Sequence, residues 1–308
     1  MSTRRVWLSR RRLLQSAAAV GFAYGVGRYS QVTSATSNDV GMANDLRTTK
    51  DLRMSRIFIT GSTDGLGRAA ARTLMDEGHQ VVLHARSKQR ASVLAELAPR
   101  AAGMVIGDLG SASEVRSIAE HVNKIGRMDA VIHNAGVYQV PDRGKTPEGH
   151  ATVLAVNALA PYILTALIER PKRLVYLSSG MHRGAGDSLN DVDWTERRWD
   201  AGAAYSESKL YLTALAFAVA RRWPDVLSNA VDPGWVPTKM GGPSAPDDLT
   251  QGHLTQTWLA TSDDPAARVS GKYWHHRKQE KPAPATLDPA FQDRVVARFA
   301  ELTGVSLT

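Results

Sequence analysis

"MSRIFITGSTDGLGR" (residues 54–68) joins a short apolar run to a glycine-rich turn and the start of a helical pattern. The run at 56–60 is apolar and β-branched, as in a buried strand, and Gly61, Gly65 and Gly67 lie between it and the helical residues. A helix that begins there presents free N–H groups and the positive end of its dipole, which suits a pyrophosphate. Because such turns also occur for packing reasons alone, this turn favours a dinucleotide site but needs support from the rest of the chain.

Short apolar runs and helical patterns alternate along the chain. Strands are predicted at 56–60, 80–84, 102–106, 129–133, 173–177 and 227–231, and helices at 65–77, 111–125 and 147–170. This alternation implies right-handed crossovers and a parallel sheet with helices on both faces. We therefore predict an α/β fold, a Rossmann-type doubly wound parallel sheet, in a single domain over 54–308 without internal repeats.

The net charge of +8 is concentrated before the predicted fold. Residues 1–53 hold nine of the 38 basic and three of the 30 acidic residues, which leaves 29 basic and 27 acidic residues in 54–308. A nearly balanced body gives no electrostatic footprint for nucleic acid, so we predict no nucleic-acid partner.

Other site classes are excluded by composition. The chain has no cysteine, which removes disulfides, thiolate nucleophiles and cysteine zinc sites. "HHRK" (275–278) invites a metal site, but adjacent histidines rarely bind one ion and no acid cluster is close in sequence, so we predict a surface turn and no metal. No window of 18 consecutive apolar residues occurs, and we predict no membrane span.

Residues 1–53 lie outside the predicted fold. "SRRRLLQ" (9–15) matches a twin-arginine export signal, and "SAAAVGFAYGVG" (16–27) is an apolar run of signal-peptide length. If this segment is translated, it would export an already folded protein. The alternative is that synthesis begins at Met54, two residues before the first strand.

The second predicted strand ends in "LHARS" (83–87), where a site for NAD usually carries an acid that binds the ribose 2′-hydroxyl. This chain has Arg86 instead, with Lys88 and Arg90 close behind. A guanidinium can clamp a 2′-phosphate that a carboxylate would repel. The alternative is a solvated basic helix start. The pattern favours NADP(H) over NAD(H).

"YSESK" (205–209) places Tyr205 and Lys209 on one face of a helix. A phenol with a pKa of about 10 is a poor acid or base at neutral pH, but a neighbouring ammonium favours its ionised form. Because this spacing arises easily by chance in a chain with eight tyrosines, the pair alone proves little.

Polar residues follow three other predicted strands. Ser178 and Ser179 come after 173–177, Asn134 after 129–133, and Asp108 shortly after 102–106. Such residues are common in loops, but the carboxyl ends of parallel strands share one edge of the sheet, where α/β sites are built. Because all of these residues follow the carboxyl ends of predicted strands, we expect them to lie together in one site.

Taken together, these residues resemble the short-chain dehydrogenase/reductase family over essentially all of 54–308, and its retinol-dehydrogenase-like branch in particular. The segments that carry the resemblance are "TGSTDGLG" (60–67), "GDL" (107–109), "NAG" (134–136), Asn157 in "AVNALAPYI", "SS" (178–179), "YSESK" and "DPGWVPT" (232–238). The glycine spacing fits the oxidoreductases of the family and disfavours its epimerases and dehydratases. Asp64, where some NADP enzymes have Arg or Ser, leaves Arg86 to recognise most of the 2′-phosphate.

The resemblance implies a role for each matching residue. Tyr205 would be the acid in carbonyl reduction and the base in alcohol oxidation, and Lys209 would lower its pKa and bind the nicotinamide ribose. Ser179 would bind the substrate oxygen, and Asn157 would hold a water between Lys209 and solvent. The implied cofactor-binding residues are Gly61, Ser62, Thr63, Asp64, Gly65, Leu66, Gly67, Arg86, Asp108, Leu109, Asn134, Ala135, Gly136, Tyr205, Lys209, Pro233, Gly234, Val236 and Thr238.

Substrate choice in such a sheet depends on loops beyond the strand ends, here 181–202 and 239–257. The aromatic and apolar residues in and beside them are Met181, His182, Trp194, Trp199 and Trp235. We predict a largely apolar aldehyde, ketone or alcohol as substrate, although the tryptophans would serve equally well to pack a long loop.

The remaining expectations concern the molecule as a whole. The run "LYLTALAFAVA" is apolar almost all round, which favours a homo-oligomer that covers its outer face. Because NADPH is replenished in the cytoplasm, we predict a cytoplasmic enzyme, with export as the alternative. A different class, a regulatory protein that binds NADP without turnover, stays open, although such proteins typically lose the tyrosine or lysine.

Overall fold

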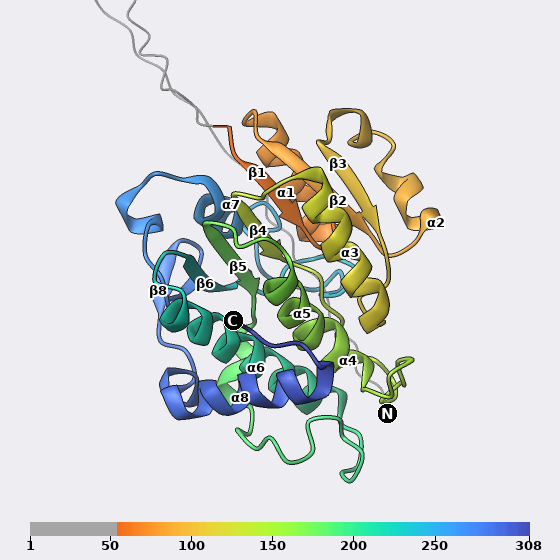
Figure 1. Cartoon of the computed structure of the whole chain (residues 1–308), viewed down its shortest axis with the longest axis vertical. Coiled ribbons are helices and arrows are strands. Elements are labelled where there is room, and N and C mark those ends of the chain that lie inside the picture. The colour runs from red at the N-terminus through yellow and green to blue at the C-terminus, as the bar shows by residue number, and fades with distance from the viewer. Residues whose placement is uncertain (1–53) are drawn as a thin grey trace, which may run out of the picture. The chain divides into compact units, whose positions relative to one another are not determined.

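The computed structural model describes residues 54–308 (Figure 1). The predicted export signal and the alternative start at Met54 concern residues 1–53, and the signal lies outside the described residues.

The described chain is built on one eight-stranded sheet. Its order is β3-β2-β1-β4-β5-β6-β7-β8, with every neighbouring pair parallel except the antiparallel pair β7 and β8. The strands are β1 (Arg56–Ile59), β2 (Gln80–Ala85), β3 (Gly103–Ile106), β4 (Ala130–His133), β5 (Arg173–Leu177), β6 (Leu227–Asp232), β7 (Tyr273–His275) and β8 (Lys278–Glu280). The strand order reverses beside β1, which confirms the predicted doubly wound parallel sheet.

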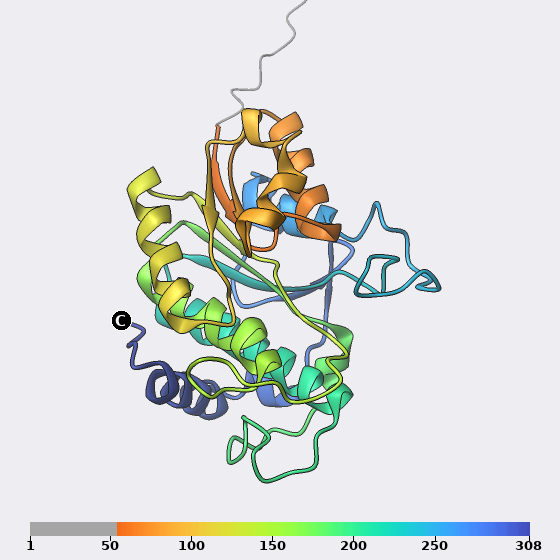
Figure 2. The same ribbon diagram turned by 90° about the vertical axis from the view of Figure 1, so that its right-hand side faces the viewer.

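Helices cover both faces of the sheet. They are α1 (Gly65–Asp76), α2 (Lys88–Ala91), α3 (Ala112–Ile125), α4 (Thr152–Leu154), α5 (Ala160–Leu167), α6 (Ala201–Arg222), α7 (Leu254–Thr261) and α8 (Pro289–Thr303). The short helical turns are η1 (Ser92–Leu94), η2 (Ala98–Arg100), the π-helical η3 (Ala155–Leu159), η4 (Gly180–Gly184), η5 (Pro265–Ala267) and η6 (Pro284–Leu287). In Figure 2, α3, α5 and α6 lie on one side of the strands and α1 and α7 on the other.

The alternation of side chains along each strand divides the apolar core in two. Ile57 and Ile59 pack with Val81 in the cluster beneath α1 and α7, whereas Phe58 packs with Val82 in the cluster beneath α3, α5 and α6. Because both faces are buried, the strands are apolar at nearly every position instead of alternating with polar residues. This explains why the sequence marks them so clearly.

Two elements differ from the sequence prediction. The helix predicted at 147–170 extends only from α4 to α5 and is interrupted by η3, while residues before Thr152 form a loop. The hairpin of β7 and β8 was not predicted, since each strand has three residues. His276 and Arg277, both with positive φ, form its turn, so "HHRK" is the predicted turn with a strand on either side.

The apolar helix α6 is covered within the chain itself. Its residues from Ala204 to Val219 are all buried, and α8 packs along it with Phe291, Val295 and Phe299 in the core (Figure 1). The face that suggested a second subunit is therefore already occupied by α8. No helix between Met54 and Thr308 is both long and apolar enough to cross a membrane.

Candidate active site

The glycine turn after β1 has a tight backbone conformation that would be strained for residues other than glycine. Gly61 and Gly65 have φ of +69° and +48°, and the Asp64 carboxylate caps α1 by accepting from Gly65 N–H at 2.9 Å. A Cβ on Gly67 would lie 2.3 Å from the Gly61 carbonyl oxygen and 2.4 Å from Asn134 Nδ2. Glycine is thus required at Gly67 by close packing of the turn, and at the other two positions by the backbone conformation.

His84 fixes this turn from beneath. Its Nδ1 accepts from Gly61 N–H and its Nε2 donates to the Gly107 carbonyl, both at 2.9 Å. The ring is 2% exposed, and burial lowers the pKa of His84 to about 4, so it is neutral at pH 7 and has one N–H to donate. His84 lies inside the quoted "LHARS", yet a buried apolar strand gives no sign that its histidine joins two loops.

Asn134 fastens the turn to the neighbouring strand end. Its side-chain amide donates to the Thr60 carbonyl at 2.9 Å, and its backbone N–H and that of Ala135 donate to Thr60 Oγ1 at 3.0 Å. Thr60 was not predicted as a site residue; its hydroxyl joins β1 to β4. The predicted Asn134 therefore acts on the turn as well as bordering the space in front of it.

Tyr205, Lys209 and Ser179 meet where β5 and α6 adjoin this edge. Lys209 Nζ lies 5.6 Å from the centre of the Tyr205 ring and donates to the Leu177 carbonyl at 2.6 Å. Ser179 Oγ accepts from Met181 N–H at 3.3 Å, and the Ser179 side chain is hydrogen-bonded to that of Tyr205. The spacing predicted to put tyrosine and lysine on one face of a helix does so.

The side chain of Asn157 lies one layer behind, in the π-helical turn η3. Its Oδ1 accepts from Val137 N–H at 2.8 Å, and its Nδ2 donates to the Val137 carbonyl and to Ser208 Oγ at 3.0 Å. A Cβ built on Gly136 would lie 3.3 Å from Asn157 Oδ1 and 3.4 Å from Lys209 Nζ. The missing side chain of Gly136 leaves a small space that the asparagine and the lysine both border.

Burial dominates the ionisation of the central pair. Desolvation raises the pKa of Tyr205 to about 12, with a smaller raising effect of Asp232, while the Ser179 side chain acts in the opposite direction through a hydrogen bond. Burial lowers the pKa of Lys209 to about 8, and Asp232 opposes that shift. The lowering of the tyrosine pKa that the sequence predicts from Lys209 is therefore not seen in this structure, where desolvation raises the pKa of Tyr205.

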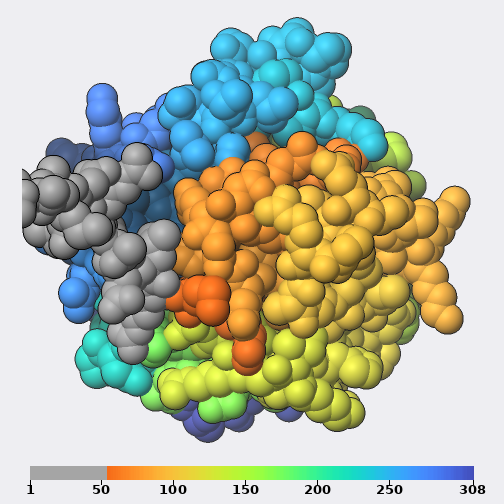
Figure 3. Space-filling model, turned by 90° about the horizontal axis from the view of Figure 1, so that it is seen from above, coloured from red at the N-terminus to blue at the C-terminus, as the bar shows by residue number. Residues whose placement is uncertain are grey.

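Two cavities meet at Tyr205. The first, of about 310 Å³, has the glycine turn on one side and Lys209 on the other, and we call it the cofactor cleft. The second, of about 590 Å³, runs past Ser179 beneath the segment that follows β6, and we call it the substrate chamber. In Figure 3 this segment, in light blue, stands beside the orange residues that follow β1.

Basic side chains surround the outer end of the cofactor cleft. Arg86 is exposed at the end of β2 and makes no hydrogen bond within residues 54–308. Arg90 donates to Thr63 Oγ1 at 3.2 Å and pairs with Asp64 at 3.4 Å, and Lys239 donates to the same carboxylate at 2.5 Å. The hydrogen bond from Lys239 is the largest of the effects that hold the pKa of Asp64 below its usual range. Arg90 and Lys239 thus neutralise the one acid in the glycine turn.

The predicted site residues fall into three groups by position. Those that line the cofactor cleft are Gly61, Thr63, Asp64, Gly65, Leu66, Gly67, Asn134, Ala135, Gly136, Tyr205, Lys209, Pro233 and Thr238. Those that line the substrate chamber but not the cleft are Ser179, Gly234 and Val236. Those outside both are Ser62, Arg86, Asp108, Leu109 and Asn157.

Besides Asn157, two of the residues outside both cavities, Ser62 and Leu109, have side chains in the interior. Ser62 Oγ donates to the Ile59 carbonyl at 2.6 Å and accepts from His84 N–H at 3.1 Å. Leu109 packs in the core near α3.

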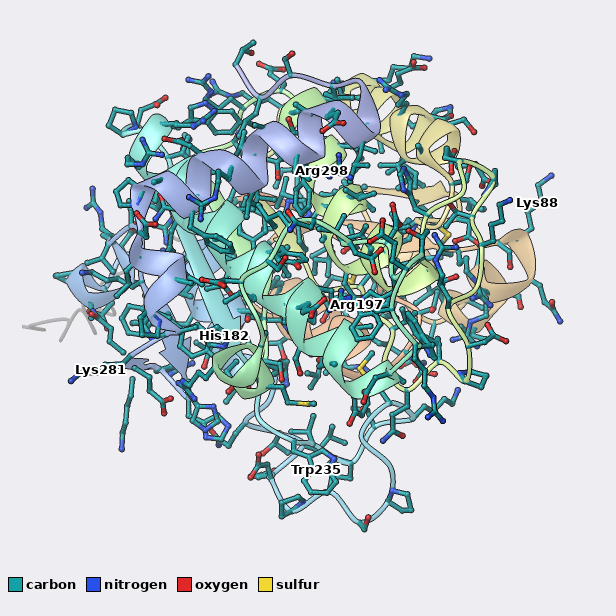
Figure 4. All side chains as sticks on the ribbon, turned by 90° about the horizontal axis from the view of Figure 1, so that it is seen from below. Lys88, His182, Arg197, Trp235, Lys281 and Arg298 are labelled. Atoms are coloured by element: carbon teal, nitrogen blue, oxygen red, sulfur yellow. The ribbon has the colours of Figure 1, made fainter. Side chains whose placement is uncertain are left out.

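The tryptophans of the 181–202 loop do not line the chamber. Trp194 is buried, donates to Glu207 Oε2 at 3.0 Å and lies under Arg197, whose guanidinium is 3.8 Å from its ring centre (Figure 4 labels Arg197). Trp199 packs against the Trp194 ring at 5.7 Å. Both tryptophans serve to pack the loop onto α6, so the packing alternative is correct for them.

His182 also faces the interior. It is fully buried, with its Nδ1 2.6 Å from the Ser179 carbonyl and its Nε2 accepting from Ala283 N–H at 2.9 Å. The ring therefore joins the serine turn to the segment after β8. Of the residues predicted to shape the pocket, Met181 and Trp235 are the ones that line the chamber.

Known proteins resemble this chain in both sequence and fold. The family model described as short chain dehydrogenase matches residues 55–249. "Short-chain dehydrogenase chyC" of Penicillium rubens is 43% identical over 82% of this chain and 99% of its own length. Human retinol dehydrogenase 13 is 28% identical over 81% of this chain and 84% of its own length. The crystal structure of an uncharacterised Mycobacterium paratuberculosis protein superposes with a TM-score of 0.71 at 24% identity, over 82% of this chain and 95% of that one.

Proposed function

Since the chain belongs to the short-chain dehydrogenase family and is an oxidoreductase dependent on NAD(P), we propose that it interconverts a carbonyl and an alcohol on an apolar small molecule. In this proposal NADP(H) is the preferred cofactor and Tyr205 is the acid and base. The observation that carries it is the position of Tyr205 at the junction of the cofactor cleft and the substrate chamber. A proton donor there can reach a substrate oxygen while the carbon beside it faces the cleft.

The cleft fits a dinucleotide by its form and its charges. The turn lines the cofactor cleft at the N-terminus of α1, where first-turn N–H groups and the positive end of the helix dipole suit a pyrophosphate. The Arg86 side chain is exposed just beyond β2 and has no partner within the described chain, so it is free to pair with a 2′-phosphate, which supports NADP(H) over NAD(H). The cofactor, when bound, supplies or accepts the hydride.

The chain's own contribution is to orient the substrate oxygen and move one proton. In reduction, the Tyr205 hydroxyl gives its proton to the substrate oxygen, and the Ser179 hydroxyl donates a hydrogen bond to that same oxygen. Lys209 keeps two N–H groups beyond its bond to the Leu177 carbonyl, and these can hold ribose hydroxyls. The positive charge of Lys209 also stabilises the phenolate that remains.

Replenishing that proton calls for a path to solvent. Asn157 Oδ1 and Lys209 Nζ border the space left by Gly136, which is suited to a water that bridges them. Asn157 is itself immobilised by both backbone groups of Val137. We therefore assign Asn157 to the proton path and not to contact with the substrate.

The test is turnover of the full chain with NADPH and with NADH against apolar aldehydes, ketones and quinones. Changing Tyr205 to Phe is expected to lower kcat by about 100-fold or more, because general acid catalysis contributes that much, while NADPH binding is kept. Tyr211→Phe is the matched control, since Tyr211 lies on the same helix and its hydroxyl donates to the Ser188 carbonyl at 2.7 Å, away from both cavities. NADPH binding without turnover of any carbonyl, or of any alcohol in reverse, would support the alternative of a non-catalytic NADP-binding regulatory protein.

The proposal extends to the whole molecule. Residues 54–308 act as a single catalytic domain in the cytoplasm, where NADPH is regenerated. The intact mass of the natively expressed protein tests this, because it distinguishes a chain that starts at Met54 from an exported one. Homo-oligomerisation stays a prediction from the resemblance, because α8 already covers the face of α6 on which the sequence argument rested.

A further inference from the structure

The substrate chamber concentrates exposed apolar side chains. Among residues 54–308, Met181 is 40% exposed, Trp235 57% and Met240 43%, and all three line this one cavity. Figure 4 shows Trp235 on the segment that projects after β6. Exposed large hydrophobic residues that gather around a cavity mark a surface that a ligand covers.

The charged side chains that line the chamber are both carboxylates. Asp232 and Asp247 line it, together with His275, and no lysine or arginine of the described chain does. Neither carboxylate forms a salt bridge within residues 54–308: Asp232 accepts from the Tyr273 hydroxyl at 3.1 Å and from Gly234 N–H at 3.0 Å, which are neutral donors. The charge of Asp232 interacts with the buried ammonium of Lys209, whose pKa it raises, whereas Asp247 has no salt-bridge partner within residues 54–308.

The neighbouring cations are engaged elsewhere. Lys239 pairs with Asp64 across the cofactor cleft at 2.5 Å, and Arg183 pairs with Glu280 at 2.6 Å. Lys209 lies deep beside Tyr205 and donates to the Leu177 carbonyl. An anionic substrate would thus enter a chamber that offers its charge no salt-bridge partner and two carboxylates.

Asp247 is held in position by two hydrogen bonds with the backbone of Trp235. Its Oδ2 accepts from Trp235 N–H at 2.6 Å, and its own N–H donates to the Trp235 carbonyl at 3.1 Å. A Cβ on Gly234, whose φ is +82°, would lie 2.5 Å from that oxygen, so the glycine makes the approach possible. The other carboxylate oxygen makes no hydrogen bond to residues 54–308, and Trp235, which lines the same chamber, is 57% exposed.

We propose that the substrate chamber selects a carbonyl or alcohol that carries a positively charged amine on an apolar body, with Asp247 and Trp235 as the cation-binding residues. The apolar body covers Met181 and Met240, and the reacting carbon lies at Tyr205 and Ser179. A carboxylate beside an aromatic ring binds an alkylammonium by charge and by cation–π attraction. This inference rests on the proposed function, and it names the substrate class that the apolar lining alone leaves open.

The experiment compares three ketones with the full chain and NADPH. Each is an acetophenone with a para chain of the same length that ends in an ammonium, a methyl or a carboxylate, so that methylenes insulate the carbonyl from the charge. We expect kcat/KM to fall in that order, with about tenfold or more between the ammonium and the carboxylate. Equal values, or the reverse order, would overturn the proposal.

Two neighbouring aspartates provide a matched pair of variants. Asp247→Asn keeps an oxygen that can accept from Trp235 N–H but removes the charge, and it should bring the ratio between ammonium and carboxylate substrates close to one. Asp248→Asn should leave the ratio unchanged, because Asp248 accepts from Thr250 and does not line the chamber. A ratio that survives Asp247→Asn would overturn the assignment of Asp247.

A binding measurement separates this inference from the proposed function. Calorimetric titration of the full chain saturated with NADP⁺ uses 4-phenylbutylammonium and 4-phenylbutyrate, neither of which can react. Tighter binding of the ammonium, lost in Asp247→Asn, supports charge selection even if no ketone is reduced. Equal binding overturns it even if all three ketones are turned over.

Discussion

His84 shows how one buried side chain can control both the stability and the ligand site of this protein. Its ring joins Gly61 of the glycine turn to Gly107 after β3, and both bonds require the neutral tautomer that donates from Nε2. Protonation would leave Nδ1 without its acceptor role towards Gly61 N–H. The conformation of the glycine turn therefore depends on the protonation state of His84, and so on pH.

We predict that acid weakens the fold through His84. Its pKa is about 4 when folded, against about 6.5 when unfolded, so the unfolded chain binds the extra proton. The stabilisation is complete above pH 6.5 and is lost as pH falls towards 4. Between pH 7 and pH 5 this amounts to about 2 kcal/mol in the free energy of unfolding, measured by urea denaturation.

Substitution separates the two roles of this histidine. His84→Asn should flatten that pH dependence and weaken NADPH binding, because the link to Gly107 is lost. His133→Phe is the control: burial also lowers the pKa of His133, to about 3, but His133 packs against Tyr176 and does not touch the turn. It should flatten the pH dependence and leave NADPH binding unchanged. An unchanged pH dependence in His84→Asn would contradict the prediction.

At the scale of elements, the junction of β1 and α1 is the point where backbone geometry limits the choice of residue. Asp64 caps the helix, and Gly67 in its first turn faces the Gly61 carbonyl and the Asn134 amide. Neither neighbour can move freely, since one is backbone and the other is bonded to Thr60. The contact sets the distance between helix and turn.

Gly67→Ala should therefore destabilise the protein by about 2 kcal/mol or more and weaken NADPH binding at least about tenfold. Gly186→Ala is the matched control, because no heavy atom lies within 4 Å of a Cβ at Gly186 and its φ is not in the left-handed region. Thermal unfolding and fluorescence titration with NADPH measure the two effects. Native-like NADPH affinity in Gly67→Ala would show that the turn adapts, contrary to this account.

At the scale of the whole molecule, the C-terminal residues complete the core that the sheet and α6 begin. Phe299 of α8 is fully buried against Tyr162 and Tyr211, with ring centres 5.6 and 6.4 Å apart. The Tyr162 hydroxyl donates to the Val305 carbonyl at 2.8 Å, and Trp223 Nε1 donates to the Thr308 carbonyl at 3.0 Å. These contacts fasten the end of the chain over α5 and α6.

Phe299→Ala is expected to lower the free energy of unfolding by about 3–5 kcal/mol, the usual cost of a large cavity, and to promote self-association by uncovering α6. Glu301→Ala, on the exposed side of α8, should change stability by less than about 1 kcal/mol, since it removes only a surface ion pair with Arg298. Urea denaturation and light scattering after size-exclusion chromatography measure both effects. A monodisperse Phe299→Ala variant of unchanged mass would refute the covering role of α8.

Sequence patterns alone predicted the six strands from β1 to β6, the glycine turn, and the position of Tyr205 and Lys209 on one helix. These depend on local patterns: apolar runs, glycine positions and a spacing of four residues along one helix. The short hairpin of β7 and β8 was missed because three residues are too few to form such a pattern.

The contacts of the loops and of the apolar helix could be seen only in the folded structure. Trp194 lies under Arg197 and against α6, Trp199 packs on Trp194, and α8 lies where a second subunit was expected. The fold also joins His84 to Gly107 and sets Asp247 beside Trp235. Such contacts depend on packing and hydrogen bonding between segments that are far apart in the sequence, and residue type alone does not distinguish a tryptophan that lines a cavity from one that fills the core.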